Sequence, residues 1–197
     1  MRRLILIRHP ATAMSGTFCG HTDPDVSPKG EAQLAALLRT LQGTSIDRIV
    51  SSDLRRAQRC ADALARQHAL TAELRSALRE IHFGAWEGLR WRDIEARYRE
   101  EAHRWMEEFP GHTPPGAEPY MDFAQRIHDD AAHWLHDPSC KTLAVVTHRG
   151  VLQHLLRSHC ALESSAAWQM TSRPATAIFC EMRENGSFAA RETWFPR

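Results

Sequence analysis

The chain has 197 residues, of which 43% are hydrophobic and 25% charged, and this composition is typical of a globular protein with room for one domain and a sizeable core. Its formal net charge is only +1 and its 25 Lys and Arg residues are spread along the chain, which argues against nucleic acid or a membrane surface as a partner. Five widely spaced cysteines without a Cys-x-x-Cys pair predict reduced thiols and a cytoplasmic location.

The first apolar run, residues 4–7, predicts a strand buried on both faces, as in the interior of a parallel sheet. The run is too short for a signal peptide core or a membrane span. It ends at Arg8 and His9, and Pro10, which has no N–H, ends the strand. In an open α/β sheet, ligands bind in the crevice beyond the carboxyl ends of the strands. The Arg-His pair therefore either faces such a crevice or is a solvated end of the sheet.

Two further predicted strands are also followed by arginine or histidine residues, as the first strand is by Arg8 and His9. Residues 46–50 are followed by a Ser-Ser-Asp-Leu-Arg-Arg segment that opens a helix, and residues 143–146 are followed by Thr147, His148 and Arg149. A guanidinium is a planar fork suited to phosphate oxygens, and a helix N-terminus adds oriented N–H groups. Strand ends of this kind predict an anion site at one edge of the sheet.

Helices are predicted to flank these strands. Ser27 and Pro28 suit the N-cap and the first position of a helix. Apolar residues at helical spacing predict further helices over residues 54–65 and 151–156, and an Asn-Gly dipeptide predicts a closing hairpin over residues 176–193. The ends of the chain therefore read as alternating strands and helices around a mainly parallel sheet.

The middle of the chain, residues 80–137, lacks this alternation. Apolar side chains at helical spacing predict one helix over residues 91–106 and another over residues 123–135, with a Pro- and Gly-bearing turn at 110–119 between them. A helical insert between strands is where a substrate lid would lie, although the same aromatic residues could serve only to pack the insert onto the sheet.

Five stretches in order along the chain resemble the histidine phosphatase superfamily, in particular its phosphoglycerate-mutase-like branch. They are residues 6–9, 19–23, 51–57, 78–88 and 145–148. The chain length, the Phe-Gly-Ala-Trp-Glu-Gly segment and the Arg-His-Pro variant are most similar to α-ribazole phosphatases, enzymes of cobalamin biosynthesis. The resemblance implies a three-layer α/β/α fold, with residues 1–197 as a single domain and residues 80–137 as its helical lid.

The resemblance also implies a metal-independent and cofactor-independent phosphomonoesterase that acts on a small phosphate ester, such as α-ribazole 5'-phosphate, through a phosphohistidine. It assigns His9 as the nucleophile, Glu80 as the proton donor, and Arg8, Arg56 and His148 as a clamp on the phosphoryl group. A neutral imidazole is a competent nucleophile at pH 7. A carboxylic acid donates a proton near neutrality only if burial raises its pKa.

The resemblance points to further substrate-binding residues, some of which depart from the family pattern. Cys19 and Gly20 fall at positions that contact phosphate in the family, and Gly20 would allow a close backbone approach. Ser15 stands where many members have Asn, and Pro10 removes a backbone N–H after the nucleophile. Arg149 replaces a common Gly, and it either adds charge for a second anionic group or points to solvent.

Three alternative functions remain open at this level. A metal enzyme could use some of the 12 histidines, and His133 and His136 could share a helix face, but no His-Glu-x-x-His cluster is present and no metal is expected. A mutase would return the phosphoryl group to the substrate, although mutases of this branch tend to be longer. A non-catalytic binding module would need no proton donor. The sequence leaves the oligomeric state open, a homo-oligomer included.

Overall fold

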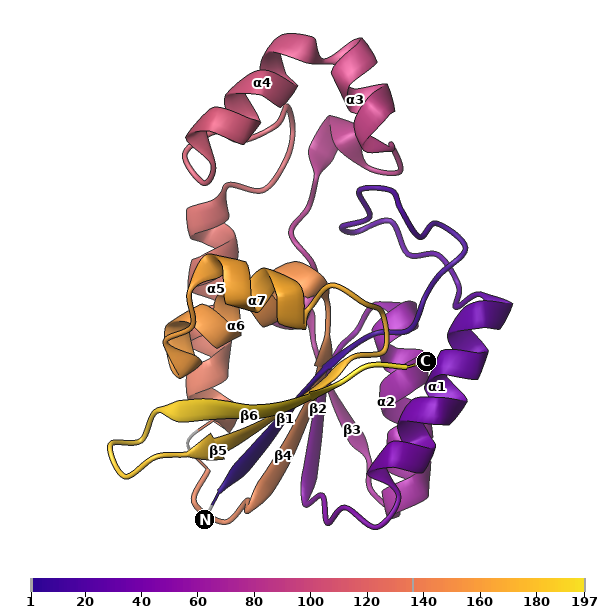
Figure 1. Ribbon diagram of the computed structural model, residues 1–197, viewed down its shortest axis with the longest axis vertical. Helices are drawn as coiled ribbons and strands as arrows, with labels where there is room; N and C mark the ends of the chain where they lie inside the picture. The colour runs from indigo at the N-terminus through magenta and orange to yellow at the C-terminus, as the bar shows by residue number, and fades with distance from the viewer. Residues whose placement is uncertain (1, 136, 197) are drawn as a thin grey trace.

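Strand β1 (Arg3–Arg8) lies inside a six-stranded sheet in the computed structural model, which describes residues 2–135 and 137–196 (Figure 1). The other strands are β2 (Arg48–Ser52), β3 (Ala72–Arg75), β4 (Thr142–Thr147), β5 (Ala177–Met182) and β6 (Phe188–Trp194). Their order across the sheet is β3-β2-β4-β1-β5-β6. The first four strands of the chain run parallel, and β5 and β6 are antiparallel to their neighbours.

Helices cover both faces of this sheet. One face carries α1 (Pro28–Leu41) and α2 (Arg55–His68), and the other carries α5 (Tyr120–Trp134), α6 (Arg149–Cys160) and α7 (Ser164–Met170). Two more helices, α3 (Trp91–Arg97) and α4 (Arg99–Glu108), stand beyond the end of the sheet (Figure 1). The predicted three-layer α/β/α fold with a mainly parallel sheet is confirmed.

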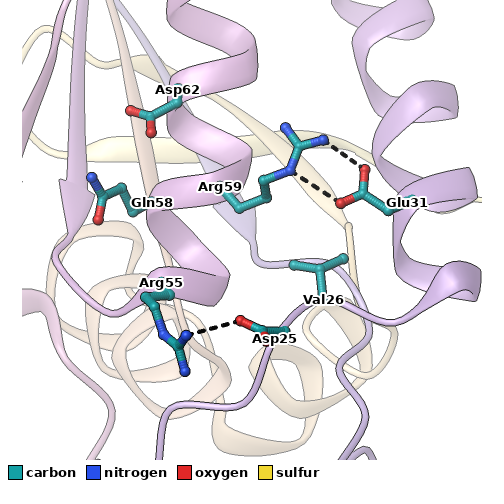
Figure 2. Close-up of a pocket in the computed structure, with 7 residues that line it drawn as sticks. All are labelled: Asp25, Val26, Glu31, Arg55, Gln58, Arg59 and Asp62. Carbon is teal, nitrogen blue, oxygen red and sulfur yellow. Dashed lines mark hydrogen bonds and ion pairs between the residues drawn. The ribbon is translucent and has the colours of Figure 1, made fainter.

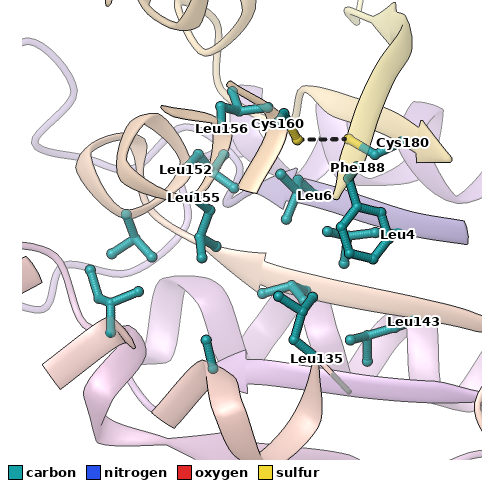
Figure 3. Close-up of a cluster of buried hydrophobic side chains, with 14 of the residues drawn as sticks. Leu4, Leu6, Leu135, Leu143, Leu152, Leu155, Leu156, Cys160, Cys180 and Phe188 are labelled. Atoms are coloured by element: carbon teal, nitrogen blue, oxygen red, sulfur yellow. Dashed lines mark hydrogen bonds between the residues drawn. The ribbon is translucent and has the colours of Figure 1, made fainter. Parts of the chain in front are cut away.

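β1 contributes to the hydrophobic core on each side of the sheet, because successive residues of a strand point to opposite faces. Leu4 and Leu6 pack in the cluster formed with α5, α6 and α7, where Figure 3 shows Leu4 beside Phe188 of β6. Ile5 and Ile7 pack in the cluster formed with α1 and α2. These four side chains are at most 3% exposed, so the predicted burial of the strand on both faces is confirmed.

Two strand predictions differ from the structure. The second strand lies two residues later than predicted, at Arg48–Ser52. Strand β3 was not predicted, because its four residues are all partly or fully exposed and form no apolar run. It pairs in parallel with β2, so a neighbouring strand rather than its own sequence pattern determines its conformation. The predicted closing hairpin is present as β5 and β6.

The prediction of one helix over residues 91–106 is wrong, since the chain breaks at Tyr98, whose φ of −131° and ψ of 45° are not helical. In an unbroken helix, Trp91 and Trp105 would lie about 21 Å apart along the axis. In the structure their ring centroids are 6.1 Å apart, and both rings pack against Phe18. The break thus gathers the aromatic side chains into one cluster with the buried Trp86.

Backbone hydrogen bonds join the two ends of the insert, residues 82–85 and 115–118, at its base. The N–H of Ala85 donates to the carbonyl of Pro115 at 2.9 Å, and that of Glu118 donates to the carbonyl of His82 at 2.9 Å. Elsewhere the five cysteines are free thiols. Across the described ranges, 2–135 and 137–196, no helix combines the length and the apolar character needed to cross a membrane.

We predict that Leu156→Ala lowers the free energy of unfolding by about 2–5 kcal/mol, because it leaves a cavity beside the sheet where Leu156 is now fully buried. The matched control is Leu74→Ala, since Leu74 on β3 is 43% exposed, and we expect a change within about 0.5 kcal/mol. Denaturant unfolding of both variants checks the prediction. Equal losses in the two variants would contradict the assigned core.

Candidate active site

Neighbouring strands bring the two strand-end histidines together. β1 pairs with β4 in parallel, with Arg8 opposite Thr147, so His9 and His148 follow the same edge of the sheet. The centroids of their rings are 5.1 Å apart. Residues that are 139 positions apart in sequence therefore form one cluster at the carboxyl ends of the strands, where ligands bind in folds of this type.

The imidazole of His9 is oriented by the backbone and is uncharged. Its Nδ1 lies 2.7 Å from the carbonyl oxygen of Pro10, and because a carbonyl only accepts, Nδ1 carries the proton and donates it. Burial, followed by the charges of Arg56 and Arg8, lowers the pKa of His9 well below its ordinary value. His9 is therefore neutral at pH 7, and its Nε2 keeps a lone pair that can act as a nucleophile.

His148 is fully buried, and protein groups bond to both of its ring nitrogens. The Nε of Arg56 can only donate, so Nδ1 of His148 accepts this hydrogen bond, at 3.2 Å. Burial and nearby cations lower the pKa of His148 well below its ordinary value. The neutral ring then carries its proton on Nε2, which donates to Oγ of Ser52 at 2.8 Å. A phosphate can receive this proton only if the hydrogen bond to Ser52 is exchanged.

Arg56 joins the loop at residues 19–23 to the histidine cluster. Its side chain is 1% exposed, and a carboxylate oxygen of Asp23 lies 3.6 Å from Nη1. The guanidinium donates to the carbonyl oxygens of three loop residues, at distances of 2.8, 3.2 and 2.7 Å for Thr22, Cys19 and Gly20 respectively. Because these contacts use most of its N–H donors, Arg56 both fixes the loop and supplies positive charge.

Arg8 is a second cation of the cluster, and it is partly buried. Its Nη1 donates to the carbonyls of Thr171 and Ser172, each at 2.9 Å. Its Nε is buried without a hydrogen-bond partner among the residues that the structure describes. Burial, followed by the charge of Arg149, lowers the pKa of Arg8 to about 10, so the guanidinium is still protonated at neutral pH. It therefore has a donor available for a bound anion.

Glu80 is a buried carboxyl beside these cations and is only 7% exposed. Its Oε1 accepts a hydrogen bond from the N–H of Ile81 at 3.0 Å, and its Oε2 accepts one from the N–H of Gly150 at 2.9 Å. Burial raises the pKa of Glu80, although both hydrogen bonds and the charges of Arg56 and Arg8 oppose the rise. A raised pKa is the property that a proton donor at this position requires.

Glu87 also organises this region, and the sequence did not reveal its role. Its carboxylate accepts hydrogen bonds from the backbone N–H groups of Gly20, His21 and Thr22 at 3.2, 2.9 and 3.0 Å. It also accepts one from the N–H of Phe83 at 3.0 Å. Burial acts to raise the pKa of Glu87, but the hydrogen bonds hold it below the ordinary value. Glu87 therefore fastens the loop at residues 19–23 to the base of the insert.

Gly20, which the resemblance places at a phosphate contact, is packed closely against groups of the protein itself. A Cβ at Gly20 would collide with the carbonyl oxygen of Ile81 and with the Glu87 carboxylate. The N–H of Gly20 already donates to Glu87. The missing side chain makes room for the protein's own groups, and this close packing becomes visible only once the loop and the residue 81 backbone are placed side by side.

The cluster opens into a cavity of about 1440 Å³, which Ser15, Cys19 and Arg149 also line. Ser15 is exposed, and its Oγ accepts a hydrogen bond from the N–H of Thr12 at 3.0 Å. The thiol of Cys19 donates to the carbonyl of Thr22 at 3.1 Å, and burial raises its pKa, so it is uncharged. Arg149 is half-buried, and the alternative that it points to solvent is wrong.

Aromatic side chains of the insert and of α5 and α7 form much of the remaining wall. These residues are Trp91, Trp105, Phe109, Tyr120, Phe123 and Trp168. The rings of Trp105, Phe109 and Tyr120 follow one another at centroid distances of 5.3 and 5.4 Å. The cavity therefore combines a cationic end beside His9 with a wide apolar wall, which suits a phosphate ester with a bulky organic group.

A smaller hollow of about 350 Å³ lies between α1 and α2, and Figure 2 shows the charged side chains that line it. Its two arginines are already paired, since Arg59 contacts Glu31 at 2.9 Å and Arg55 contacts Asp25 at 3.1 Å. Exposed pairs of this kind contribute little to stability and leave little charge for a ligand. We therefore assign the ligand site to the large cavity.

Metal binding was one of the alternative functions. Within residues 2–135 and 137–196, no group of three or more His, Cys, Asp or Glu side chains is arranged to hold a metal ion. His136, one of the two histidines considered, lies outside the described residues. The other, His133, bonds through Nδ1 to the carbonyl of Asp129 at 2.9 Å.

Fold and site together are those of an α/β protein with an anion-binding cleft at the carboxyl edge of its sheet. A family model for the histidine phosphatase superfamily (branch 1) matches residues 4–193. The chain belongs to this superfamily and is a phosphatase.

Comparison with individual proteins gives the same result. The adenosylcobalamin/α-ribazole phosphatase of Escherichia coli is 29% identical over 168 residues, which are 84% of this chain and 83% of that protein. The crystal structure of the α-ribazole phosphatase from Shigella flexneri superposes with a TM-score of 0.85 at 25% identity, covering 96% of this chain and 94% of the other. A mycobacterial glucosyl-3-phosphoglycerate phosphatase gives a TM-score of 0.80 at 26% identity and covers 96% of each chain.

We predict that Glu87→Ala loosens the loop at residues 19–23, because four backbone N–H groups lose their acceptor. The free energy of unfolding should fall by about 1.5–3 kcal/mol, and amide exchange at Gly20, His21 and Thr22 should accelerate. Hydrogen exchange read by mass spectrometry checks this, with the exposed Glu95→Ala as the control. Unchanged exchange in the loop would show that Glu87 does not hold it.

Proposed function

We propose that the protein is a metal-independent phosphomonoesterase in which His9 attacks the phosphorus atom of a small phosphate ester. The observation that carries this proposal is the state of His9, a neutral imidazole with Nδ1–H bound to the Pro10 carbonyl, placed near the cations Arg56 and Arg8. The bond from Nε2 to phosphorus forms as the bond from phosphorus to the leaving oxygen breaks, which gives a phosphohistidine. Arg8 and Arg56 stabilise the charge on the transferring group.

Glu80 serves this reaction as the acid and then as the base. Its buried carboxyl gives its proton to the leaving oxygen, and the resulting carboxylate then takes a proton from the water that attacks phosphorus. The bond from Nε2 to phosphorus breaks in this second step, which releases inorganic phosphate and restores both groups. The raised pKa of Glu80 supports the assignment, because it keeps the acid protonated at a higher pH than an exposed carboxyl.

α-Ribazole 5'-phosphate is the first substrate that we propose. The names of the Escherichia coli and Shigella flexneri relatives support it. The aromatic wall of the cavity also supports it, because a ring-bearing leaving group buries apolar surface there. We further propose that residues 80–137 form the lid over this substrate, since Trp105, Phe109 and Tyr120 of that segment line the same cavity as His9.

We predict that His9→Ala abolishes turnover, with a loss on the order of a thousandfold or more, while the fold is retained. Phosphate release from α-ribazole 5'-phosphate, 3-phosphoglycerate and p-nitrophenyl phosphate, measured with chelator present, checks this. Mass spectrometry of the acid-quenched enzyme should find a phosphate on His9. The exposed His128→Ala is the control and should keep full activity. Substantial activity in His9→Ala would contradict the assignment of His9 as the nucleophile. Phosphoryl exchange between phosphoglycerates without release of inorganic phosphate would favour a mutase.

We predict that Glu80→Gln slows the hydrolysis of alkyl phosphates much more than that of p-nitrophenyl phosphate, whose leaving group needs no proton. The pH profile of kcat/KM for an alkyl ester should have a basic limb, because activity is lost as pH rises through the raised pKa of Glu80. It should lose activity in acid only below the ordinary histidine pKa, since the pKa of His9 is lowered.

The basic limb should be missing in Glu80→Gln, whereas ionisation of the substrate affects both enzymes equally. Steady-state kinetics of both enzymes from pH 4 to pH 9 therefore distinguishes a basic limb caused by Glu80 from one caused by the substrate. Equal slowing of both esters, or an unchanged basic limb, would mean that another group is the acid.

A further inference from the structure

Arg149 occupies an unusual position in the cavity. It is the first residue of α6, directly after His148. The central carbon of its guanidinium lies 3.5 Å from the ring centroid of Trp168, a residue of α7 that is 57% exposed and lines the same cavity. A guanidinium stacked on an indole is held in one orientation, while its N–H groups, which lie in its plane, are left free for another partner.

Arg149 has a hydrogen-bond donor that the described residues leave unpaired. Its Nε is buried and has no partner within the described part of the chain. Arg8 and Arg56, in contrast, both donate to backbone carbonyls that hold them in place. A buried donor without an acceptor is unfavourable, and it marks a position where a ligand atom can complete the structure.

The position of Arg149 relative to the reacting groups indicates which part of a substrate it faces. The charges of Arg56 and Arg8 lower the pKa values of both histidines. Arg149 instead acts on the pKa of Arg8, and its own pKa responds to Glu80. Its neighbour Gly150 donates directly to Oε2 of Glu80. Arg149 is thus the neighbour of a residue that contacts the proposed proton donor, to which the leaving oxygen must come close.

We propose that Arg149 binds a second anionic group, a carboxylate or a phosphate, on the leaving group of the substrate. A planar fork with free N–H groups matches two anionic oxygens, whereas a neutral hydroxyl would satisfy only one donor. Trp168 is the positioning residue that keeps the fork aimed into the cavity. The inference rests on the proposed phosphatase activity, and it concerns phosphate esters other than α-ribazole 5'-phosphate, whose leaving group carries no second anion.

The test compares matched phosphate esters that differ only in a second anion. O-Phosphoserine and O-phosphoethanolamine differ by a carboxylate, and glucose 1,6-bisphosphate and glucose 6-phosphate differ by a phosphate. The wild type should prefer the more anionic member of at least one pair in kcat/KM, and the pair that responds identifies the anion. Arg149→Ala should reduce this preference by roughly tenfold to a hundredfold, mainly through KM.

Four further variants separate the effect of the guanidinium fork from that of positive charge in general. Arg149→Lys keeps the charge without the fork and should recover only part of the preference. Arg66→Ala removes an exposed arginine of α2 that does not line the cavity, and it should leave the preference unchanged. Trp168→Leu should raise KM for the more anionic ester, and Trp168→Phe should restore it, because an aromatic face is retained.

Two outcomes would overturn the inference. If Arg149→Ala slowed both members of each pair equally, Arg149 would act on the transferring phosphoryl group instead. If it lowered the melting temperature without changing the preference, its contact with Trp168 would be structural only. Calorimetric binding of the same pairs to His9→Ala, with and without Arg149→Ala, needs no turnover. A preference seen there without hydrolysis by the wild type would refute the phosphatase mechanism and leave the second-anion site standing.

Discussion

The candidate site depends on one buried cation, Arg56. A charged group removed from water is strongly unfavourable unless polar partners surround it. In this chain the partners are carbonyls of the loop at residues 19–23, the nearby carboxylate of Asp23 and Nδ1 of His148. The start of α2, the loop after β1 and the residue after β4 therefore have to assemble together. Loss of any one of them would leave the guanidinium with unmet hydrogen bonds, so the site forms as a unit.

The arrangement also leaves an excess of positive charge that an anion can balance. Both histidines are neutral because burial and the arginines disfavour a further positive charge. Arg8 remains protonated, although its pKa is lowered to about 10. Glu80 is the carboxyl of the cluster, and burial favours its uncharged form. The positive charges that would attract a phosphate thus keep the imidazoles unprotonated, whereas burial raises the pKa of Glu80 against the effect of those charges.

Local patterns in the sequence were sufficient for the features that depend on neighbouring residues. The apolar run before Arg8, the Ser27 cap and the spacing of buried residues in α2 and α6 all act within a few positions. Features that depend on distant contacts were missed or misread. β3 is held by its pairing with β2. The break at Tyr98 lets Trp91 and Trp105 converge on Phe18, which the spacing within one helix could not indicate.

The same distinction applies to the site. His9, Arg8, Arg56, Glu80 and His148 were identified from their motifs, and the structure gathers them into one cluster. The close packing around Gly20 and the role of Glu87 were missed, because the groups in contact lie more than 60 residues apart in the chain. The link that Glu87 makes between the loop and Phe83 also bears on how such proteins diversify. It anchors the base of the insert independently of α3 and α4, so a change in the length or composition of these helices would leave the loop at residues 19–23 in place.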